Sequence, residues 1–409
     1  MDSAALVTEY VRLGLRFDRL LGGYADAYTG EPVLRRRVGN EAPPLPSDLA
    51  AQARMLLAAL ADTDLPDSRR RFLRAQLTAL ECAGRKLAGT AIRFTEEVEA
   101  YFQVRPTPGD PDEYRQAHRE LDELAPGPGG LAERITALRE RDRIPPERLR
   151  ECVLAVSSAL RDRVRRRFGL PPQETVDYRI VTDQPWSGFN QYLGDFRSRV
   201  AVNADVGLRA SNLPHLVAHE AYPGHHTEHC RKDVGLVDRQ RHLEHTIFLV
   251  NTPQCLLAEG MADLGLHAVV GPGWGPWAAE VLADLGITFD GELVERAEAA
   301  ASRLLAVRQD AVLMLHDQGA DESQVVNFLR RWLLVPEAKA RHQVRFMADP
   351  LWRAYTSTYV EGYRLLRTWL EITPPGTTTT ERYRRLLDEP LVPETIRSEI
   401  AAEVPLFTR

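Results

Sequence analysis

Residues 214–230 read PHLVAHEAYPGHHTEHC, with five histidines and two glutamates in seventeen residues. Zinc binds neutral imidazole nitrogens and carboxylate oxygens, and a catalytic zinc site has three protein ligands plus an open position. A water molecule in that position loses its proton near neutral pH, and a neighbouring carboxylate can accept it. The stretch therefore indicates a metal site built around His219, Glu220 and His225.

The spacing of these histidines is unusual for a single helix. His219 is placed like the first ligand of a zincin helix, but position 223, where the second histidine usually stands, is Pro. On a regular helix with about 100° per residue, His225 would lie about 120° away from His219, and His226 about 10 Å further along. Pro223 removes a backbone N–H and disturbs the helix, so a kink or bulge could swing His225 back. The alternative is a helix that ends at Tyr222 and is followed by a histidine-rich turn.

A third ligand is expected from another helix, in the segment CLLAEGMADLG at residues 255–265. This segment is apolar except for Glu259 and Asp263, which are four residues apart and share one helix face. Burying two carboxylates without a cation would be costly. A metal ligand at Glu259, with Asp263 orienting a ligand histidine, removes that cost. The alternative is a helix N-terminus with acids placed favourably for its dipole, which Pro253 just upstream supports.

The composition is that of an ordinary globular chain. It has 409 residues, 44% hydrophobic and 27% charged, with a net charge of −6. An acidic balance argues against nucleic-acid and anionic-membrane partners, and no apolar run is long enough to span a bilayer. The four cysteines form no C-x-x-C pair, and the N-terminus does not read as a signal peptide. We expect a cytoplasmic protein with no nucleic-acid or membrane partner; its oligomeric state stays open.

The hydrophobic periodicity predicts a mainly α protein. Apolar residues recur at three- and four-residue spacings through the first 170 residues and again from about 210 onwards. Between about 174 and 204 the sequence alternates and is rich in β-branched and aromatic residues, which predicts a small antiparallel β-sheet next to the active-site helix. No other strand region is expected. We predict a helical N-terminal lobe over 1–172 and a metal-binding catalytic lobe over 173–409, intertwined as one domain.

The motif HEAYPGHH at 219–226, followed about 35 residues later by an Ala-Glu-Gly helix, resembles the bacterial domain of unknown function family 885. That family is placed among the gluzincin-type metallopeptidases, and this chain looks like its shorter branch. Further matches are YLGDFRSR at 192–199, VNAD at 202–205 and NTPQC at 251–255. The likeness covers residues from about 175 to 375.

The resemblance implies a zincin-like metallohydrolase core. In it His219 and His225 are metal ligands, Glu220 is the general base and Glu259 is the third ligand. It also implies a site in a cleft formed with the N-terminal lobe. A strand at 196–202 is expected beside it, available to pair with an extended substrate.

Other side chains are candidates for the surroundings of the metal. Gluzincin-type enzymes commonly use a tyrosine from a late helix to stabilise the oxyanion, and YVEG at 359–362 resembles the family's Tyr-x-x-Gly element. We expect Tyr359 in this role, with Tyr363 as its alternate; the other interpretation is an aromatic packing stripe. The residues considered for holding the ligands or the substrate, including arginines for a substrate carboxylate, are His215, His226, Asp263, Arg345 and Arg367.

These residues predict a zinc-dependent hydrolase with one zinc ion per chain. It would cleave an amide bond of a small peptide or peptide-like substrate, by metal-activated water with Glu220 as general base. Two alternatives stay open: a metal-binding zincin-fold protein without peptidase activity, and a metalloenzyme that acts on a non-peptide amide or ester. Glu220 favours an enzyme, because a protein that only binds metal has no need for a carboxylate that is not a ligand.

Overall fold

The computed structural model of the protein describes residues 1–184 and 186–407. It is mainly helical, as the sequence predicts, with two small sheets. The helices before the sheets are α1 (Ser3–Leu20), α2 (Pro32–Gly39), α3 (Pro46–Leu60), α4 (Asp67–Leu87), α5 (Phe94–Phe102), α6 (Pro111–Leu124), α7 (Leu131–Glu140) and α8 (Leu149–Arg167). Those that follow are α9 (Leu213–Glu220), α10 (His225–Lys232), α11 (Pro253–Val269), α12 (Trp274–Ala283), α13 (Gly291–Ser302), α14 (Ala306–His316), α15 (Glu322–Leu333), α16 (Glu337–Ala348), α17 (Tyr363–Glu371), α18 (Thr379–Asp388) and α19 (Pro393–Phe407).

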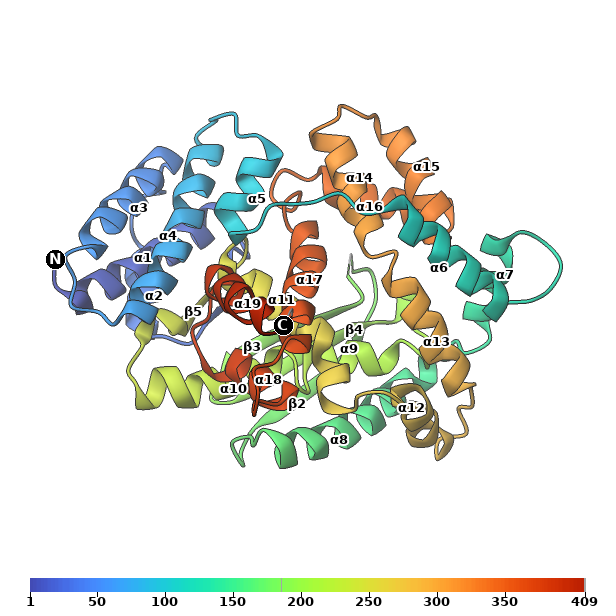
Figure 1. Ribbon diagram of the computed structural model, residues 1–409. Coiled ribbons are helices and arrows are strands. Elements are labelled where there is room, and N and C mark those ends of the chain that lie inside the picture. The colour runs from blue at the N-terminus through green and yellow to red at the C-terminus, as the bar shows by residue number, and fades with distance from the viewer. Residues whose placement is uncertain (185, 408–409) are drawn as a thin grey trace.

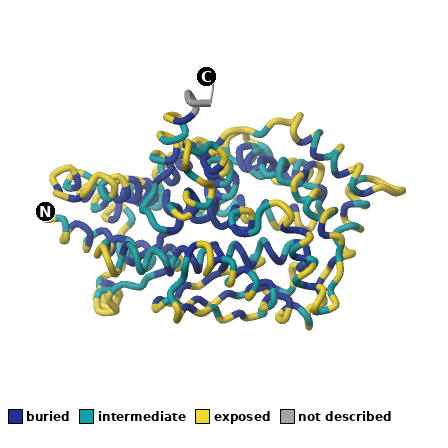
Figure 2. Tube along the Cα trace, turned by 60° about the horizontal axis from the view of Figure 1, so that its bottom comes forward, coloured by how far each residue is buried: buried dark blue, intermediate teal, exposed yellow. Residues whose placement is uncertain are grey.

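The helices form two groups around a central region. Figure 1 shows α1 to α5 at one end of the molecule and α6, α7 and α13 to α15 at the other, with α11 and the sheets between them. Buried residues run along the middle of the molecule and exposed ones lie outside, as Figure 2 shows. One cluster of buried hydrophobic side chains contains residues from both sides of position 172, so the two predicted lobes share a core. None of the described helices is long and apolar enough to cross a membrane.

The predicted sheet is present but is mixed, which corrects the antiparallel arrangement expected for it. Its strands are β2 (Thr175–Val181), β3 (Gly188–Gly194) and β4 (Arg197–Asn203), in the order β2-β4-β3. β3 and β4 form an antiparallel hairpin, whose two turn residues, Asp195 and Phe196, both have positive φ as a tight two-residue turn requires. Because β4 then lies between β3 and β2, which run in opposite directions, it must be parallel to β2.

The position of β4 also corrects the expectation of a strand at 196–202 that is free to pair with substrate. β4 is hydrogen-bonded on both sides, to β2 and to β3. Its backbone groups are therefore already used, and the edges of this sheet belong to the other two strands.

A second sheet was not predicted. It pairs β1 (Ala25–Tyr28) with β5 (Ile247–Leu249) in antiparallel register. Both strands are too short to show a period of two in the sequence. Ala25 pairs with Leu249 and Ala27 with Phe248, so Asp26 is an extra residue in β1 and forms a β-bulge.

Helix α11 lies at the centre of the fold. Nearly all of its residues are buried, and it packs against α4, α5, α8, α9, α17 and α18. A helix with apolar side chains on every face is normally buried on every face. The few polar side chains in such a helix need hydrogen-bonding or charged partners. Those exceptions include Glu259, which is buried, and Asp263, which is partly buried.

Candidate metal centre

The two histidine-bearing helices, α9 and α10, are joined by a tight turn. α9 ends at Glu220 and α10 starts at His225, because Pro223 offers no N–H to continue the first helix. The backbone N–H of Gly224 donates back to a carbonyl of α9 at 2.8 Å. A Cβ at Gly224 would lie 1.8 Å from the carbonyl oxygen of His219, so this return of the chain requires glycine. The first helix therefore ends before Pro223, as in the alternative of a helix followed by a histidine-rich turn. The chain nevertheless folds back towards α9 after this end.

This turn brings one nitrogen of each histidine close to a carboxylate from α11. Nε2 of His219 and Nε2 of His225 are 3.2 Å apart. Oε2 of Glu259 lies 3.3 Å from the first nitrogen, and Oε1 lies 3.6 Å from the second. Ligand atoms of the three residues all lie within 4.8 Å of one another. The structure thus brings together the three predicted ligands, and His225 instead of His226 is the second histidine.

Asp263 decides which nitrogen of His219 faces the other two groups. Its Oδ1 lies 2.9 Å from Nδ1 of His219, and an ionised carboxylate can only accept a hydrogen bond. Nδ1 therefore carries a proton, and the electron pair of Nε2 points towards His225 and Glu259.

This donor set fits a zinc ion. Two imidazoles and a carboxylate are a common zinc ligand set, and three electron-pair donors at this spacing repel each other unless a positive charge lies between them. Burial lowers the pKa of His219, but hydrogen bonds with Asp263 and Glu259 outweigh it and raise the pKa well above its usual value. The surroundings thus favour positive charge at Nε2, either a proton or a metal ion.

Glu220 lies beside this trio without belonging to it. Its side chain is buried, and within residues 1–184 and 186–407 no group hydrogen-bonds to its carboxylate. Burial is the main cause that raises the pKa of Glu220, to about 7. The end of α9 is fixed by Asn190 of β3, whose Nδ2 donates to the Glu220 carbonyl at 2.6 Å. An unengaged carboxylate with a pKa near neutrality has the property that a general base needs.

The tyrosine that touches the ligand set is Tyr355, which was not selected from the sequence. Its hydroxyl donates to Oε1 of Glu259 at 2.8 Å. The ring of Tyr359 lies edge-on to that of Tyr355, with centroids 5.6 Å apart, and its hydroxyl bonds to none of the described residues. Tyr363 is partly buried and its hydroxyl interacts with Arg367. Of the two predicted tyrosines, Tyr359 therefore has the free hydroxyl.

Two glycines let the tyrosine segment approach α11. A Cβ on Gly260 would lie 2.5 Å from the carbonyl carbon of Gly362, and one on Gly362 would lie 2.6 Å from a backbone oxygen of α11. The backbone of α11 and that of the tyrosine segment are thus in contact at Gly260 and Gly362, where neither residue has a side chain. Gly260 directly follows Glu259, and Gly362 closes the π-helical turn Thr358–Gly362 that carries Tyr359. Such turns are frequent at functional sites.

A buried network holds α10 from behind. Its centre is Glu174, which is fully buried and lies just before β2. The carboxylate bonds to Nε of Arg161 at 2.6 Å, a guanidinium nitrogen of Arg165 at 2.9 Å, the hydroxyl of Tyr222 at 2.7 Å and Nε2 of His226 at 3.0 Å. The other ring nitrogen of His226 lies 2.8 Å from Oγ of Ser198 in β4. His226 therefore connects the sheet and Glu174 to the helix that carries His225.

The remaining predicted residues lie in other surroundings. His215 packs edge-on against Trp274 of α12, with ring centroids 4.5 Å apart. Arg345 is exposed on α16 beside His342. Arg367 is exposed on α17 and bonds to Glu371 at 2.8 Å. None of the three hydrogen-bonds to a metal-site residue in the part of the chain that the structure describes, and their roles stay predictions.

A second histidine cluster lies in the segment before β5. Ligand atoms of His242, Glu244 and His245 also lie within 4.8 Å of one another. Both oxygens of Glu244, however, accept hydrogen bonds from Arg69, each at 2.6 Å. The arginine already neutralises this carboxylate, so the cluster is a poorer cation site than the first one.

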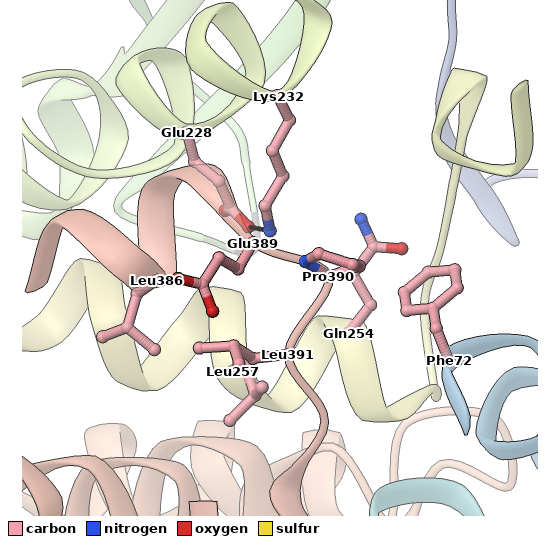
Figure 3. Close-up of a pocket in the computed structure, with 9 residues that line it drawn as sticks. All are labelled: Phe72, Glu228, Lys232, Gln254, Leu257, Leu386, Glu389, Pro390 and Leu391. Carbon is pink, nitrogen blue, oxygen red and sulfur yellow. Dashed lines mark hydrogen bonds and ion pairs between the residues drawn. The ribbon is translucent and has the colours of Figure 1, made fainter. Parts of the chain in front are cut away.

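A small pocket beside α10 does not include the metal centre. Figure 3 shows its lining, with the ion pair of Glu228 and Lys232 at one side. Its other residues come from α4, α11 and the segment around α18: Phe72, Gln254, Leu257, Leu386, Glu389, Pro390 and Leu391. The predicted cleft is therefore not this pocket.

Sequence reasoning missed several residues that the structure places at the site. Tyr355 stands four residues before the predicted Tyr359, a helical spacing that is visible in the sequence. Glu174 follows Pro171-Pro172-Gln173 in a loop, where a lone acid gives no signal.

No protein-family model matches the sequence, and no curated protein matches it. Solved structures resemble it in fold. A candidate lipoprotein from Colwellia psychrerythraea has a TM-score of 0.53 at 15% identity, over 87% of this chain and 66% of that one. A candidate lipoprotein of unknown function from Shewanella oneidensis has a TM-score of 0.50 at 14% identity, over 90% and 76%. The M32 carboxypeptidase from Deinococcus radiodurans R1 has a TM-score of 0.40 at 15% identity, over 93% and 88%.

These likenesses concern the fold alone. The chain spans about two thirds of the length of the Colwellia protein, at 66%, and at such identities no activity follows from a shared architecture. The likeness to the carboxypeptidase is too distant to support a conclusion about this chain.

Proposed function

We propose that the protein is a zinc-dependent hydrolase that cleaves an amide bond in a small peptide or peptide-like substrate. The observation that carries the proposal is the convergence of His219, His225 and Glu259 within 4.8 Å, beside a buried Glu220 that is not needed as a ligand. A metal storage or scaffold site has no use for that additional carboxylate. The resemblance of the motif to gluzincin-type peptidases supports the same conclusion.

His219, His225 and Glu259 would hold the metal. A zinc ion bound there acidifies a water molecule and polarises a carbonyl group. Glu220 accepts the proton from water and returns it to the leaving amine, for which a pKa of about 7 is suitable.

The other side chains of the site position these groups. Asp263 keeps His219 in the tautomer that presents Nε2. Tyr355 holds one oxygen of Glu259. Tyr359, whose hydroxyl is free, donates a hydrogen bond to the substrate oxygen as negative charge develops on it.

The first experiment is elemental analysis of the purified protein beside His219→Ala and Glu220→Gln. We expect about one zinc per chain in the wild type and in Glu220→Gln, and little in His219→Ala. The wild type should hydrolyse members of a peptide and amide library that Glu220→Gln leaves intact. If the wild type takes up no metal when zinc is offered, the hydrolase proposal fails. If it binds zinc but only esters or non-peptide amides are cleaved, the substrate class changes and the catalytic roles stand.

A further inference from the structure

Three side chains that can bind a metal lie in one turn between α10 and α11. Glu244 and His245 belong to the 3₁₀ turn Leu243–Thr246, and His242 directly precedes it. The backbone N–H of His245 donates to the carbonyl of His242 at 3.1 Å, which closes the turn and gathers the three side chains. Their ligand atoms all lie within 4.8 Å of one another, the same limit that the ligands of the candidate metal centre meet.

Three ring nitrogens in this turn lack hydrogen-bond partners. Nδ1 of His242 and both ring nitrogens of His245 are buried, and none of them has a partner among the described residues. Most buried polar side-chain atoms in proteins have a partner, and an exception points to a bound water molecule or ion. Burial is the main cause that lowers the pKa of both histidines, so each ring is neutral and keeps an electron pair for a ligand bond.

Glu244 offers an oxygen ligand that is already held in place. Its carboxylate is fully buried and accepts two hydrogen bonds from Arg69 of α4, each at 2.6 Å. An ionised carboxylate has about four lone-pair directions, and a bidentate arginine uses two of them. The others remain for a cation. Carboxylates that bind metals are commonly hydrogen-bonded by a neighbouring group, so Arg69 fixes the orientation of Glu244.

Positive charge nearby limits the affinity of such a site. Arg69 neutralises the charge of Glu244. His245 also lines a small cavity together with Lys232, whose ammonium group pairs with Glu228 (Figure 3). At the candidate metal centre, by contrast, no arginine or lysine bonds to any of the three ligands within the described ranges. A divalent ion should therefore bind here more weakly than there.

We propose that His242, Glu244 and His245 form a second zinc site, weaker than the first, which fastens the segment between α10 and α11. Two imidazoles and a carboxylate are a suitable ligand set for zinc. Glu244 is tied to α4 through Arg69, and His245 packs on Phe72 of the same helix, with ring centroids 4.3 Å apart. A metal ion bound here therefore holds the segment before β5 against α4. The inference does not rest on the proposed hydrolase activity.

Isothermal titration calorimetry of the metal-free full chain with zinc chloride tests the inference. Wild type should show two binding events of different affinity, each at about one ion per chain. His219→Ala should lose the tight event and keep the weak one, whereas His242→Ala and His245→Ala should lose only the weak one. His342→Ala, which removes an exposed histidine of α16, should keep both events. A weakly held ion is lost during purification, so elemental analysis of the isolated protein still reports the first site alone.

Thermal melts give a second readout that separates this site from adventitious binding. Excess zinc should raise the melting temperature of His219→Ala, because an ion that binds only the folded state stabilises it. It should not raise that of the double variant His219→Ala/His242→Ala. Melts without zinc check that the variants fold. His242→Ala leaves the contact of His245 with Phe72 in place, so it decides the test if His245→Ala does not fold.

The possible results distinguish the two sites. If His219→Ala takes up no zinc, or if both other histidine variants keep the weak event, the second site is wrong and the first one stands. If wild type shows only the weak event and His242→Ala abolishes it, the second site stands and the proposed function fails. If wild type shows neither event, both are wrong.

Discussion

Replacing Glu174 by Gln tests the network behind α10, and we expect the substitution to lower the free energy of unfolding by about 3 kcal/mol at pH 7. Burial raises the pKa of Glu174, but its hydrogen bonds outweigh burial and lower the pKa to about 2, from an ordinary 4.5. Since one pKa unit corresponds to 1.36 kcal/mol, this difference is about 3 kcal/mol. Arg161 and Arg165 are 33% and 38% exposed. Water can replace part of their contact, so the lower end of the usual range of about 3–5 kcal/mol for a broken buried pair applies.

The same argument fixes the pH dependence of the effect. A carboxylate whose pKa is lower in the folded state stabilises the fold fully above its unfolded pKa, near 4.5, and loses this contribution as the pH falls towards 2. Wild type should therefore be more stable than Glu174→Gln at pH 7, and the difference should shrink steadily below about pH 4.5.

Urea unfolding followed by tryptophan fluorescence at pH 7 and at pH 3 measures both quantities. Glu337→Gln is the matched control, because Glu337 and its partners Arg330 and Arg341, which lie 3.2 and 2.7 Å away, are all exposed. Surface pairs of this kind contribute little, so the control should keep the wild-type unfolding midpoint. A loss below about 1 kcal/mol for Glu174→Gln at pH 7, or an equal loss at both pH values, would refute the reasoning from buried hydrogen bonds.

Two further substitutions test the metal centre and its turn. Tyr355→Phe removes the hydroxyl that bonds to Glu259 at 2.8 Å, and zinc affinity measured by competition with a chelating dye should fall roughly tenfold; unchanged affinity would contradict the positioning role. Gly224→Ala places a Cβ 1.8 Å from the carbonyl oxygen of His219. The melting temperature should drop by an amount that corresponds to about 1–3 kcal/mol of unfolding free energy. Gly235→Ala, where a Cβ would meet no atom within 4 Å, should melt like the wild type, and equal melting of both glycine variants would show that the turn is not tightly packed.

Much of the fold could be predicted because helices of this length carry their own periodicity. Apolar residues at three- and four-residue spacings predict helices through the first 170 residues, and the structure has the helices α1 to α8 there. The second sheet could not be found, because its strands have only three or four residues and their pairing depends on tertiary contacts.

The residues of the candidate site could be predicted where they stand close together in the sequence. They could not be predicted where only tertiary packing brings them together. His219, Glu220 and His225 occur in one dense motif, so residue types alone identified them. Their geometry was harder to predict, since helix periodicity separates the two histidines and only the turn at Pro223 reunites them. The bond of Tyr355 to Glu259 and the central position of β4 depend on contacts between distant segments, which no local pattern shows.

The pairing of β1 with β5 has a consequence for the order of events during synthesis. The backbone N–H of Thr29, just after β1, bonds to the carbonyl of Thr246 at 2.8 Å, and these residues are 217 positions apart in the chain. A ribosome releases the N-terminal strand first, so β1 waits for more than two hundred further residues before its partner emerges, and contacts over such separations form slowly. Until then the edge of β1 that faces β5 has no hydrogen-bonding partner. A nascent chain of this protein therefore has an unpaired strand edge that is open to wrong pairing until β5 at 247–249 has been translated.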